Sequence, residues 1–129
     1  NLAYYIRDEL DVVKMNKSCL RLLNHTDFKC FSKSHTDVKT FDCDISFAKW
    51  DIIEGGYKFT ITSNRFLRNM VRSIVGTMIN IGRSKISNDD FQKILESRNR
   101  SEAGLSVPAL GLFLTSITYE EIILKIWKK

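Results

Sequence analysis

Apolar residues between positions 64 and 82 recur at steps of three and four, which is the period of a helix that buries one broad face. Asn64 is a residue type that caps helix starts, and Gly82 is one that ends helices in the left-handed conformation. We therefore expect a core helix over residues 64–82. Its apolar positions are Phe66, Met70, Val71, Ile74, Val75, Met78 and Ile79.

Two stretches, residues 41–47 and 57–62, instead alternate apolar and polar side chains at every second position. This is the period of a strand with one buried face. Gly55 and Gly56 lie between the two stretches and favour a turn, so we expect an antiparallel hairpin. A further strand is predicted over residues 112–119.

Two more helices are predicted on either side of the hairpin and the core helix. The first covers residues 14–23 and leaves through a polar turn at 24–27. The second begins at Ser87, where Asp90 three residues later can complete a relative of the capping box, and it closes near Arg98.

The remaining segments lack a period. Residues 28–40 and 102–111 are predicted to be loops, and residues 120–129 either continue the last strand or form a short amphipathic end. The order helix, hairpin, helix, helix, strand predicts an α+β fold, in which an antiparallel or mixed sheet is covered by helices on one face.

Length and composition favour one globular domain. The chain has 129 residues, of which 43% are hydrophobic and 27% charged, and its apolar runs are too short to span a bilayer. It starts without methionine and without an apolar signal core, so we expect a cytoplasmic protein and a piece of a longer chain.

The three cysteines, Cys19, Cys30 and Cys43, are odd in number and widely spaced, which favours reduced thiols over a disulfide scaffold. His25 and His35 flank Cys30, but the spacing does not match a zinc site, and no metal is expected.

Basic residues concentrate in the middle of the chain. Residues 57–100 carry nine Lys and Arg against three Asp and Glu. Arg65, Arg68 and Arg72 fall at steps of three and four, on one flank of the predicted core helix, and no Asp or Glu lies between positions 64 and 88. A solvated flank remains possible, but the missing carboxylates favour an anionic partner such as phosphate.

No spacing typical of a catalytic triad or of a glycine-rich phosphate loop occurs. Carboxylates, imidazoles and thiols that could act as acids, bases or nucleophiles lie mostly before residue 52, and simple turn or solvent-facing roles suffice for Asp27, Asp42 and Asp44. The candidates are Asp27, Asp37, Asp42, Asp44, Asp51, His25, His35 and Cys30.

Three motifs resemble those of TruA-type tRNA pseudouridine synthases. Residues 64–76 read N-R-F-L-R-N-M-V-R-S-I-V-G and resemble the family signature N-x-F-L-x-x-M-V-R-x-I-V-G. Residues 27–32 are similar to its D-F-x-x-F-x element, and residues 108–114 resemble its P-A-x-G-L-x-L strand. Because the motifs keep the family's order over nearly the whole chain, the sequence is identified as a member.

The resemblance implies that residues 1–129 are the C-terminal domain, one half of the pseudouridine synthase catalytic fold. The family's R-T-D-x-G-V-H-A-like motif, which carries the catalytic aspartate, has no counterpart here. The family isomerises uridine to pseudouridine in the anticodon stem-loop of tRNA, as a homodimer and without a cofactor or required metal. We therefore expect this chain alone to be inactive.

Site residues follow from the same resemblance. It implies that Arg72 pairs with the absent catalytic aspartate and that Leu112 lines the uracil pocket. Arg65 and Arg68 are expected to bind tRNA because of their charge and helical spacing. The plainer alternatives are a structural ion pair for Arg72, ordinary core for Leu112, and a solvated surface for Arg65 and Arg68.

Two other functions fit the same residues. One is a non-catalytic RNA-binding or dimerisation module derived from the fold. The other is a protein-interaction domain, which would show no salt-dependent binding of RNA. A catalytic-aspartate motif in the coding sequence upstream of Asn1 would favour the enzyme.

Overall fold

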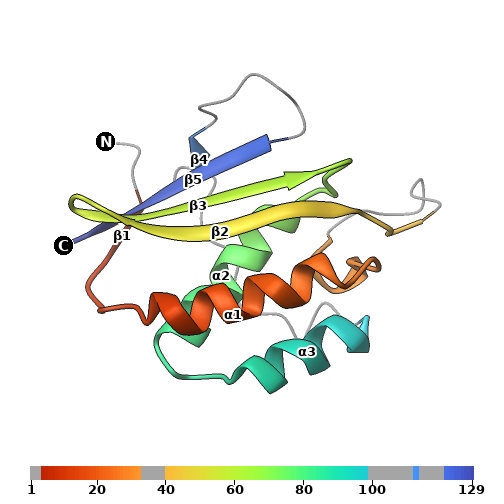
Figure 1. The fold of residues 1–129 in the computed structure, drawn as a ribbon, viewed down its shortest axis with the longest axis horizontal. Coiled ribbons are helices and arrows are strands. Elements are labelled where there is room, and N and C mark those ends of the chain that lie inside the picture. Colours follow the sequence, from red (N-terminus) through yellow and green to blue (C-terminus); the bar gives the residue numbers. More distant parts are fainter. Residues whose placement is uncertain (1–3, 33–39, 99–111, 114–120) are drawn as a thin grey trace.

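The computed structural model describes residues 4–32, 40–98, 112–113 and 121–129 (Figure 1). This part of the chain contains both strands and helices, and the helices all lie on one side of the sheet. The elements are, in chain order, β1 (Tyr4–Ile6), α1 (Val12–Leu23), the 3₁₀ turn η1 (Lys29–Phe31), β2 (Ile45–Ile53), β3 (Gly56–Ser63), α2 (Met70–Gly82), α3 (Asn88–Ser97), β4 (Leu112–Phe113) and β5 (Glu121–Lys128).

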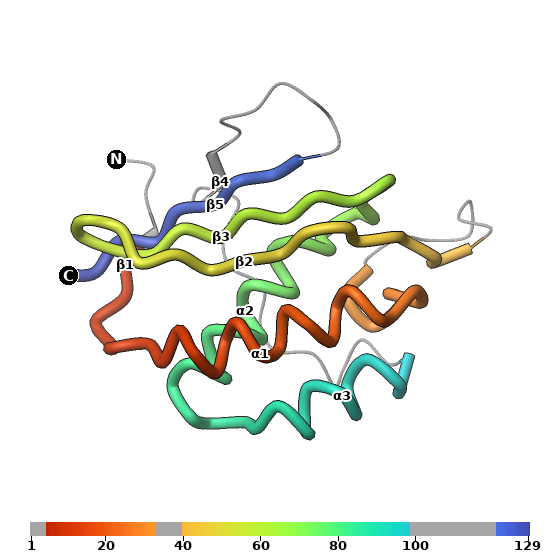
Figure 2. Tube along the Cα trace, viewed as in Figure 1, coloured from red at the N-terminus to blue at the C-terminus, as the bar shows by residue number. Residues whose placement is uncertain are grey.

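The sheet has the strand order β1-β5-β3-β2. β3 pairs antiparallel with β2 and β5, whereas β1 pairs parallel with β5. β4 pairs antiparallel with the first half of β5, and β1 pairs parallel with the second half of β5. The segments nearest the two ends of the chain therefore meet in one sheet (Figure 2). This mixed sheet with helices on one face confirms the predicted α+β class.

The strands β5 and β1 were not fully predicted from the sequence. Residues 120–129 are predicted either to continue a strand or to form an amphipathic end, and residues 121–128 of them form the central strand β5. It has neighbours at both edges, β3 on one side and β1 and β4 on the other, and its buried side chains are Leu124 and Ile126. β1 was not predicted, since its three residues are too few to show a period.

β2 begins later than predicted and contains a register shift between Ile45 and Phe47. An extra residue at such a bulge moves the following side chains to the opposite face. Phe47, predicted to face the core, is therefore 46% exposed, whereas Trp50 is buried. β3 keeps its predicted alternation, with Phe59 and Ile61 fully buried.

Trp50 joins the sheet to the helices. Its ring lies 4.8 Å from that of Phe59 in β3, and its Nε1–H donates to Met78 Sδ in α2 over 3.2 Å. Asn16 of α1 forms two hydrogen bonds with the Trp50 backbone: its Nδ2 donates to the carbonyl over 3.1 Å, and its Oδ1 accepts from the amide over 2.8 Å. Asn16 thus satisfies backbone groups that the edge strand β2 would otherwise leave open.

Helices α1 and α3 begin at side-chain caps. Asp11 accepts from the Lys14 amide over 3.1 Å, so α1 starts two residues earlier than predicted. The predicted cap of α3 is confirmed as a full capping box, in which Ser87 Oγ accepts from the Asp90 amide over 3.0 Å and Asp90 Oδ2 accepts from the Ser87 amide over 2.9 Å. α3 lies on the far side of α1 and α2 from the sheet (Figure 1).

The core helix α2 covers only part of its predicted range. It starts at Met70 rather than at Asn64, and it ends at Gly82 as predicted. Gly82 does not adopt the left-handed conformation, which occurs instead at Ser84 with φ of 61°. Glycine is needed at 82 for space, because a Cβ there would lie 2.6 Å from Met15 Sδ. No helix in the described ranges is long and apolar enough to cross a membrane.

The close pairing of β3 and β5 makes a first prediction. A Cβ at Gly56 would lie 2.1 Å from the Ile126 carbonyl oxygen, so Gly56→Ala forces two paired strands apart. We expect it to lower the free energy of unfolding by about 3 kcal/mol. Gly55→Ala is the control, since its Cβ would come no closer than 3.8 Å to Trp127 and only its φ of 80° is unfavourable, costing about 1–2 kcal/mol. Equal losses in urea denaturation would contradict this difference.

Candidate functional site

The chain enters α2 through a tight turn over Leu67–Met70. The Met70 amide donates to the Leu67 carbonyl over 3.0 Å, and the Leu67 amide donates to Met70 Sδ over 3.5 Å. Asn69 has φ of 70° and ψ of 1°, the values of the third residue of a type II turn. Asn69, and not Asn64, is thus the residue that precedes the helix.

This turn corrects the predicted arrangement of arginines. Arg72 lies in the first turn of α2, but Arg65 and Arg68 precede the helix, so the three do not share one helical flank. Arg68 is exposed within the turn. Arg65 Nη1 donates to the Thr40 carbonyl and hydroxyl, both over 3.3 Å, and to the Asp42 carbonyl over 3.5 Å. Arg65 therefore ties the segment before β2 to the segment before α2.

The helix α2 is buried on nearly all sides. All its residues are buried except Arg72 and Asn80, which are half-buried. A helix that is apolar all round must lie inside the protein. Arg72 is the one charged residue of α2. This otherwise buried helix therefore carries a single guanidinium, on a half-buried side chain.

Arg72 lines a hollow of about 120 Å³ at the start of α2. Ile122 of β5 forms part of its wall, and Phe66, which was expected in the core, is partly buried and packs against the core beside it. Within the described ranges, no carboxylate oxygen lies within 4.0 Å of the Arg72 guanidinium. The residues that line the hollow are Phe66, Leu67, Asn69, Met70, Val71, Arg72 and Ile122.

Leu112, the predicted pocket residue, is described by its backbone alone. It pairs with Leu124 of β5, two residues from Ile122 in the wall of the hollow. The strand β4 therefore lies beside the part of β5 that contributes to the site, while the position of the Leu112 side chain is outside the described features.

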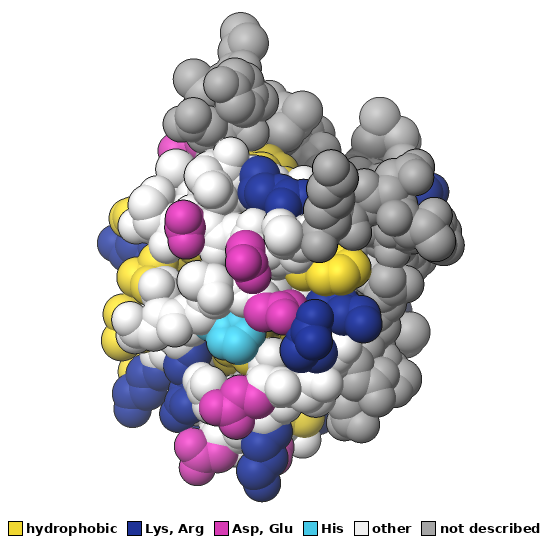
Figure 3. All heavy atoms as spheres, turned by 90° about the vertical axis from the view of Figure 1, so that its right-hand side faces the viewer, with side chains coloured by type: hydrophobic (Ala, Val, Ile, Leu, Met, Phe, Trp, Pro, Cys, Tyr) yellow, Lys and Arg dark blue, Asp and Glu magenta, His cyan; other side chains and the backbone are white. Residues whose placement is uncertain are grey.

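Some of the Lys and Arg side chains of residues 57–100 form ion pairs with carboxylates from elsewhere in the chain. Arg83 pairs with Asp8, and Arg98 Nε lies 2.6 Å from Asp27 Oδ2. At the end of the molecule that Figure 3 shows, Lys and Arg side chains are interspersed with Asp and Glu over the described surface. The local excess of charge in the sequence is therefore partly balanced in the fold by carboxylates from the first 56 residues.

Asp27 and His25, two of the candidates for acid–base chemistry, have structural partners. Besides Arg98, Asp27 accepts a hydrogen bond from the Lys29 amide over 3.0 Å, and His25 Nε2 lies 2.7 Å from the Asp27 carbonyl. His35 and Asp37 lie outside the described residues. The described ranges contain no group of three or more His, Cys, Asp or Glu placed to hold a metal ion.

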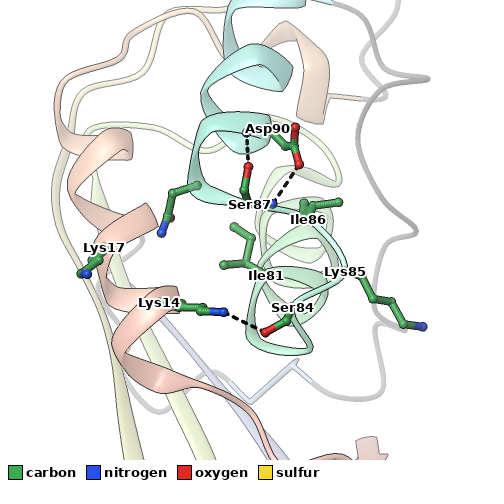
Figure 4. Close-up of a pocket in the computed structure, with 9 residues that line it drawn as sticks. Lys14, Lys17, Ile81, Ser84, Lys85, Ile86, Ser87 and Asp90 are labelled. Carbon is green, nitrogen blue, oxygen red and sulfur yellow. Dashed lines mark hydrogen bonds between the residues drawn. The ribbon is translucent and has the colours of Figure 1, made fainter.

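A second hollow, of about 350 Å³, lies between α1 and the start of α3 (Figure 4). Lys14 crosses its mouth and donates to Ser84 Oγ over 2.9 Å, whereas Lys17 and Lys85 extend away from each other. The Asp90 carboxylate already occupies the start of α3, where hydrogen bonds from the Ser87 amide and hydroxyl lower its pKa. This arrangement is typical of a capped helix start rather than of an anion site.

A family model for tRNA pseudouridine synthase matches residues 21–120. This chain belongs to the tRNA pseudouridine synthase family. The predicted resemblance is thereby confirmed, and the mixed sheet with its helices agrees with one half of the family's fold.

Curated relatives carry the name tRNA pseudouridine synthase A. The protein from Bacteroides fragilis is 50% identical over 119 residues, which are 92% of this chain and 47% of that protein. The protein from Parabacteroides distasonis is 46% identical, over 93% of this chain and 48% of its own length. The protein from Caldicellulosiruptor saccharolyticus is 38% identical, over 92% and 49%. The chain thus spans about half the length of the curated relatives it matches.

Two residues of the site were missed by the sequence reasoning. The residue type of Asn69 could have indicated a left-handed turn, since Asn is the commonest residue besides Gly in the left-handed region. It was not recognised because it lies within a helical pattern of apolar residues. Ile122 gives no such indication, because its contact with the start of α2 crosses more than forty residues of sequence.

The buried thiols give a second prediction. Burial raises the pKa of Cys19 to about 12, and burial is also the main cause that raises Cys30 to about 12 and Cys43 to about 11, from 9.0. The folded protein keeps protons that the unfolded chain loses above pH 9, so the free energy of unfolding falls as the pH rises from 9 toward 12. Each thiol contributes up to about 1.4 kcal/mol per pH unit.

Urea denaturation under reducing conditions at pH 7.5 and pH 10 measures this fall. The variant Cys19→Ala should lose less stability between the two pH values than the unaltered protein, because one of the three protons is gone. Identical losses in both proteins would show that Cys19 does not contribute.

Proposed function

We propose that this chain is the C-terminal domain of an enzyme that isomerises uridine to pseudouridine in the anticodon stem-loop of tRNA. Membership of the family supports the reaction class. The observation that carries the proposal for this domain is Arg72: a single guanidinium on a buried helix, at the edge of a hollow and without a carboxylate partner in the described residues.

Arg72 is proposed to pair with a catalytic aspartate supplied by the part of the enzyme that this chain does not include. A guanidinium within about 4–6 Å lowers the pKa of a carboxylate and keeps it ionised. The N-terminus of α2 lines the same hollow, and its helix dipole also favours negative charge. Both features suit a carboxylate that acts in its charged form.

The hollow is proposed to be one wall of the uracil site. Its volume of about 120 Å³ is well below the roughly 300–1,000 Å³ of complete ligand pockets, so further residues must complete it. Phe66 and Ile122 supply apolar surface for a base that has left its stack, and Leu112 is proposed to extend that surface.

The reaction itself is an isomerisation. The bond between the ribose C1′ and uracil N1 breaks, and a bond between C1′ and uracil C5 forms. C5 loses a proton and N1 gains one, so no atom is gained or lost and no cofactor is required. The contribution of this domain is to hold the carboxylate and one face of the base in place.

Partners follow from the same proposal. The enzyme acts as a homodimer that binds tRNA in the cytoplasm, with Arg68 and Arg65 near the phosphate backbone. Arg68 has the stronger case, because its side chain is exposed, whereas Arg65 is bound to backbone carbonyls. Contacts between Arg and phosphates weaken with salt.

Arg72→Ala tests the proposal in the full-length gene product that contains this chain. Conversion of uridine in unmodified tRNA should fall about 100-fold or more, the lower range for removing one group that stabilises charge in an active site. The variant should stay folded, since no ion pair within the described residues is lost and only the proposed pair with the aspartate of the other domain is removed. Arg83→Ala is the matched control at the other end of α2, where the side chain pairs with Asp8, and it should keep the activity.

Several outcomes decide between the functions. If the full-length protein binds tRNA but converts no uridine, the domain is a binding module and not part of an enzyme. If Arg72→Ala converts uridine at the normal rate, the role of Arg72 is wrong. Conversion by the purified chain of 129 residues alone would contradict the proposal that it lacks the catalytic carboxylate.

A further inference from the structure

The backbone at Asn69 separates the extended segment after β3 from α2. Its φ of 70° is one of three positive values at described residues other than glycine, the others being at Ser84 and Arg98. N-cap residues normally have extended backbone and bind an amide of the first turn with their side chain. Asn69 does neither: it is left-handed, and its Nδ2 donates to Ser73 Oγ over 3.2 Å.

This conformation determines where α2 begins. With Asn69 left-handed, the turn closes through the Met70 amide and the Leu67 carbonyl, and the first helical residue is Met70. Arg72 is then the third residue of the helix, at the hollow that Asn69 also lines. A right-handed Asn69 would extend the helix backward through the apolar pattern at residues 66–69 and would break the Leu67–Met70 turn.

The side chain of Asn69 reinforces this arrangement. Ser73, its partner, is buried, and its backbone amide also donates to the Asn69 carbonyl over 3.0 Å. Two hydrogen bonds therefore join residue 69 to residue 73, and Arg72 lies between them in the sequence. The direction of the first helical turn is held from both the backbone and the side chain.

We infer that Asn69 is a positioning residue for Arg72: its left-handed turn sets the direction in which the guanidinium enters the site. This inference rests on the proposed function of Arg72. The inference requires a left-handed backbone at residue 69. Glycine adopts the left-handed region freely, so it should substitute for asparagine better than any residue with a branched Cβ.

The experiment compares Asn69→Gly and Asn69→Val in the full-length gene product. Asn69→Val should lower kcat for uridine conversion at least 10-fold with little change in KM for tRNA, because binding surface is kept while Arg72 is displaced. Asn69→Gly should recover most of that loss. Ser84→Val is the matched control: it places the same strained residue type at the other end of α2, with φ of 61°, far from Arg72 in sequence.

A spectroscopic readout separates this inference from the proposed function. The Nε–H signal of Arg72 in a two-dimensional ¹H–¹⁵N spectrum, assigned by its absence in Arg72→Lys, should shift in Asn69→Val and stay near its place in Asn69→Gly and Ser84→Val. A shift with no change in kcat would support the positioning and overturn the catalytic role of Arg72. An unmoved signal in Asn69→Val, or a shift of the same size in Ser84→Val, would overturn the inference.

Discussion

The burial of α2 is the constraint on which the site depends. The helix lies beneath the sheet with apolar contacts on nearly every side, and Trp50 links it to the strands through Met78. A helix packed in this way cannot slide or rotate without opening cavities, which proteins tolerate poorly. The packing of the whole core therefore fixes the position of the Arg72 backbone at the hollow. No local ion pair is needed to hold the backbone there.

The same packing explains why the turn at Leu67–Met70 must be sharp. The chain leaves β3 at Ser63 and has only six residues before α2 begins. The turn keeps Leu67 buried and Arg68 in solvent. The left-handed residue at 69 is what reconciles a short connection with a helix fixed by its core contacts.

The parts of the fold that depend on local interactions were predictable from the sequence. The alternation in β3 and the capping box of α3 involve residues within a few positions of one another, and both were confirmed. The start of α2 was not predictable, because Phe66 and Leu67 continue its apolar period although the backbone there is not helical. The spacing argument for Arg65, Arg68 and Arg72 assumed that helix and failed with it. Arg72 was singled out through its motif, while Ile122 reaches the site only through the sheet.

Arg72 is better explained by a role in a larger site than by stability of this domain. A buried ion pair was the plainest alternative, but the five salt bridges of the described residues do not include Arg72. A guanidinium that is half-removed from water gains little for the fold unless an anion accepts its hydrogen bonds. Arg83 and Arg98, in contrast, pair with Asp8 and Asp27 within the described residues. In the proposed function, the charge of Arg72 is left available to an acidic group from outside these residues, and the small apolar hollow beside it is the part of the site that this group and one face of a base would complete.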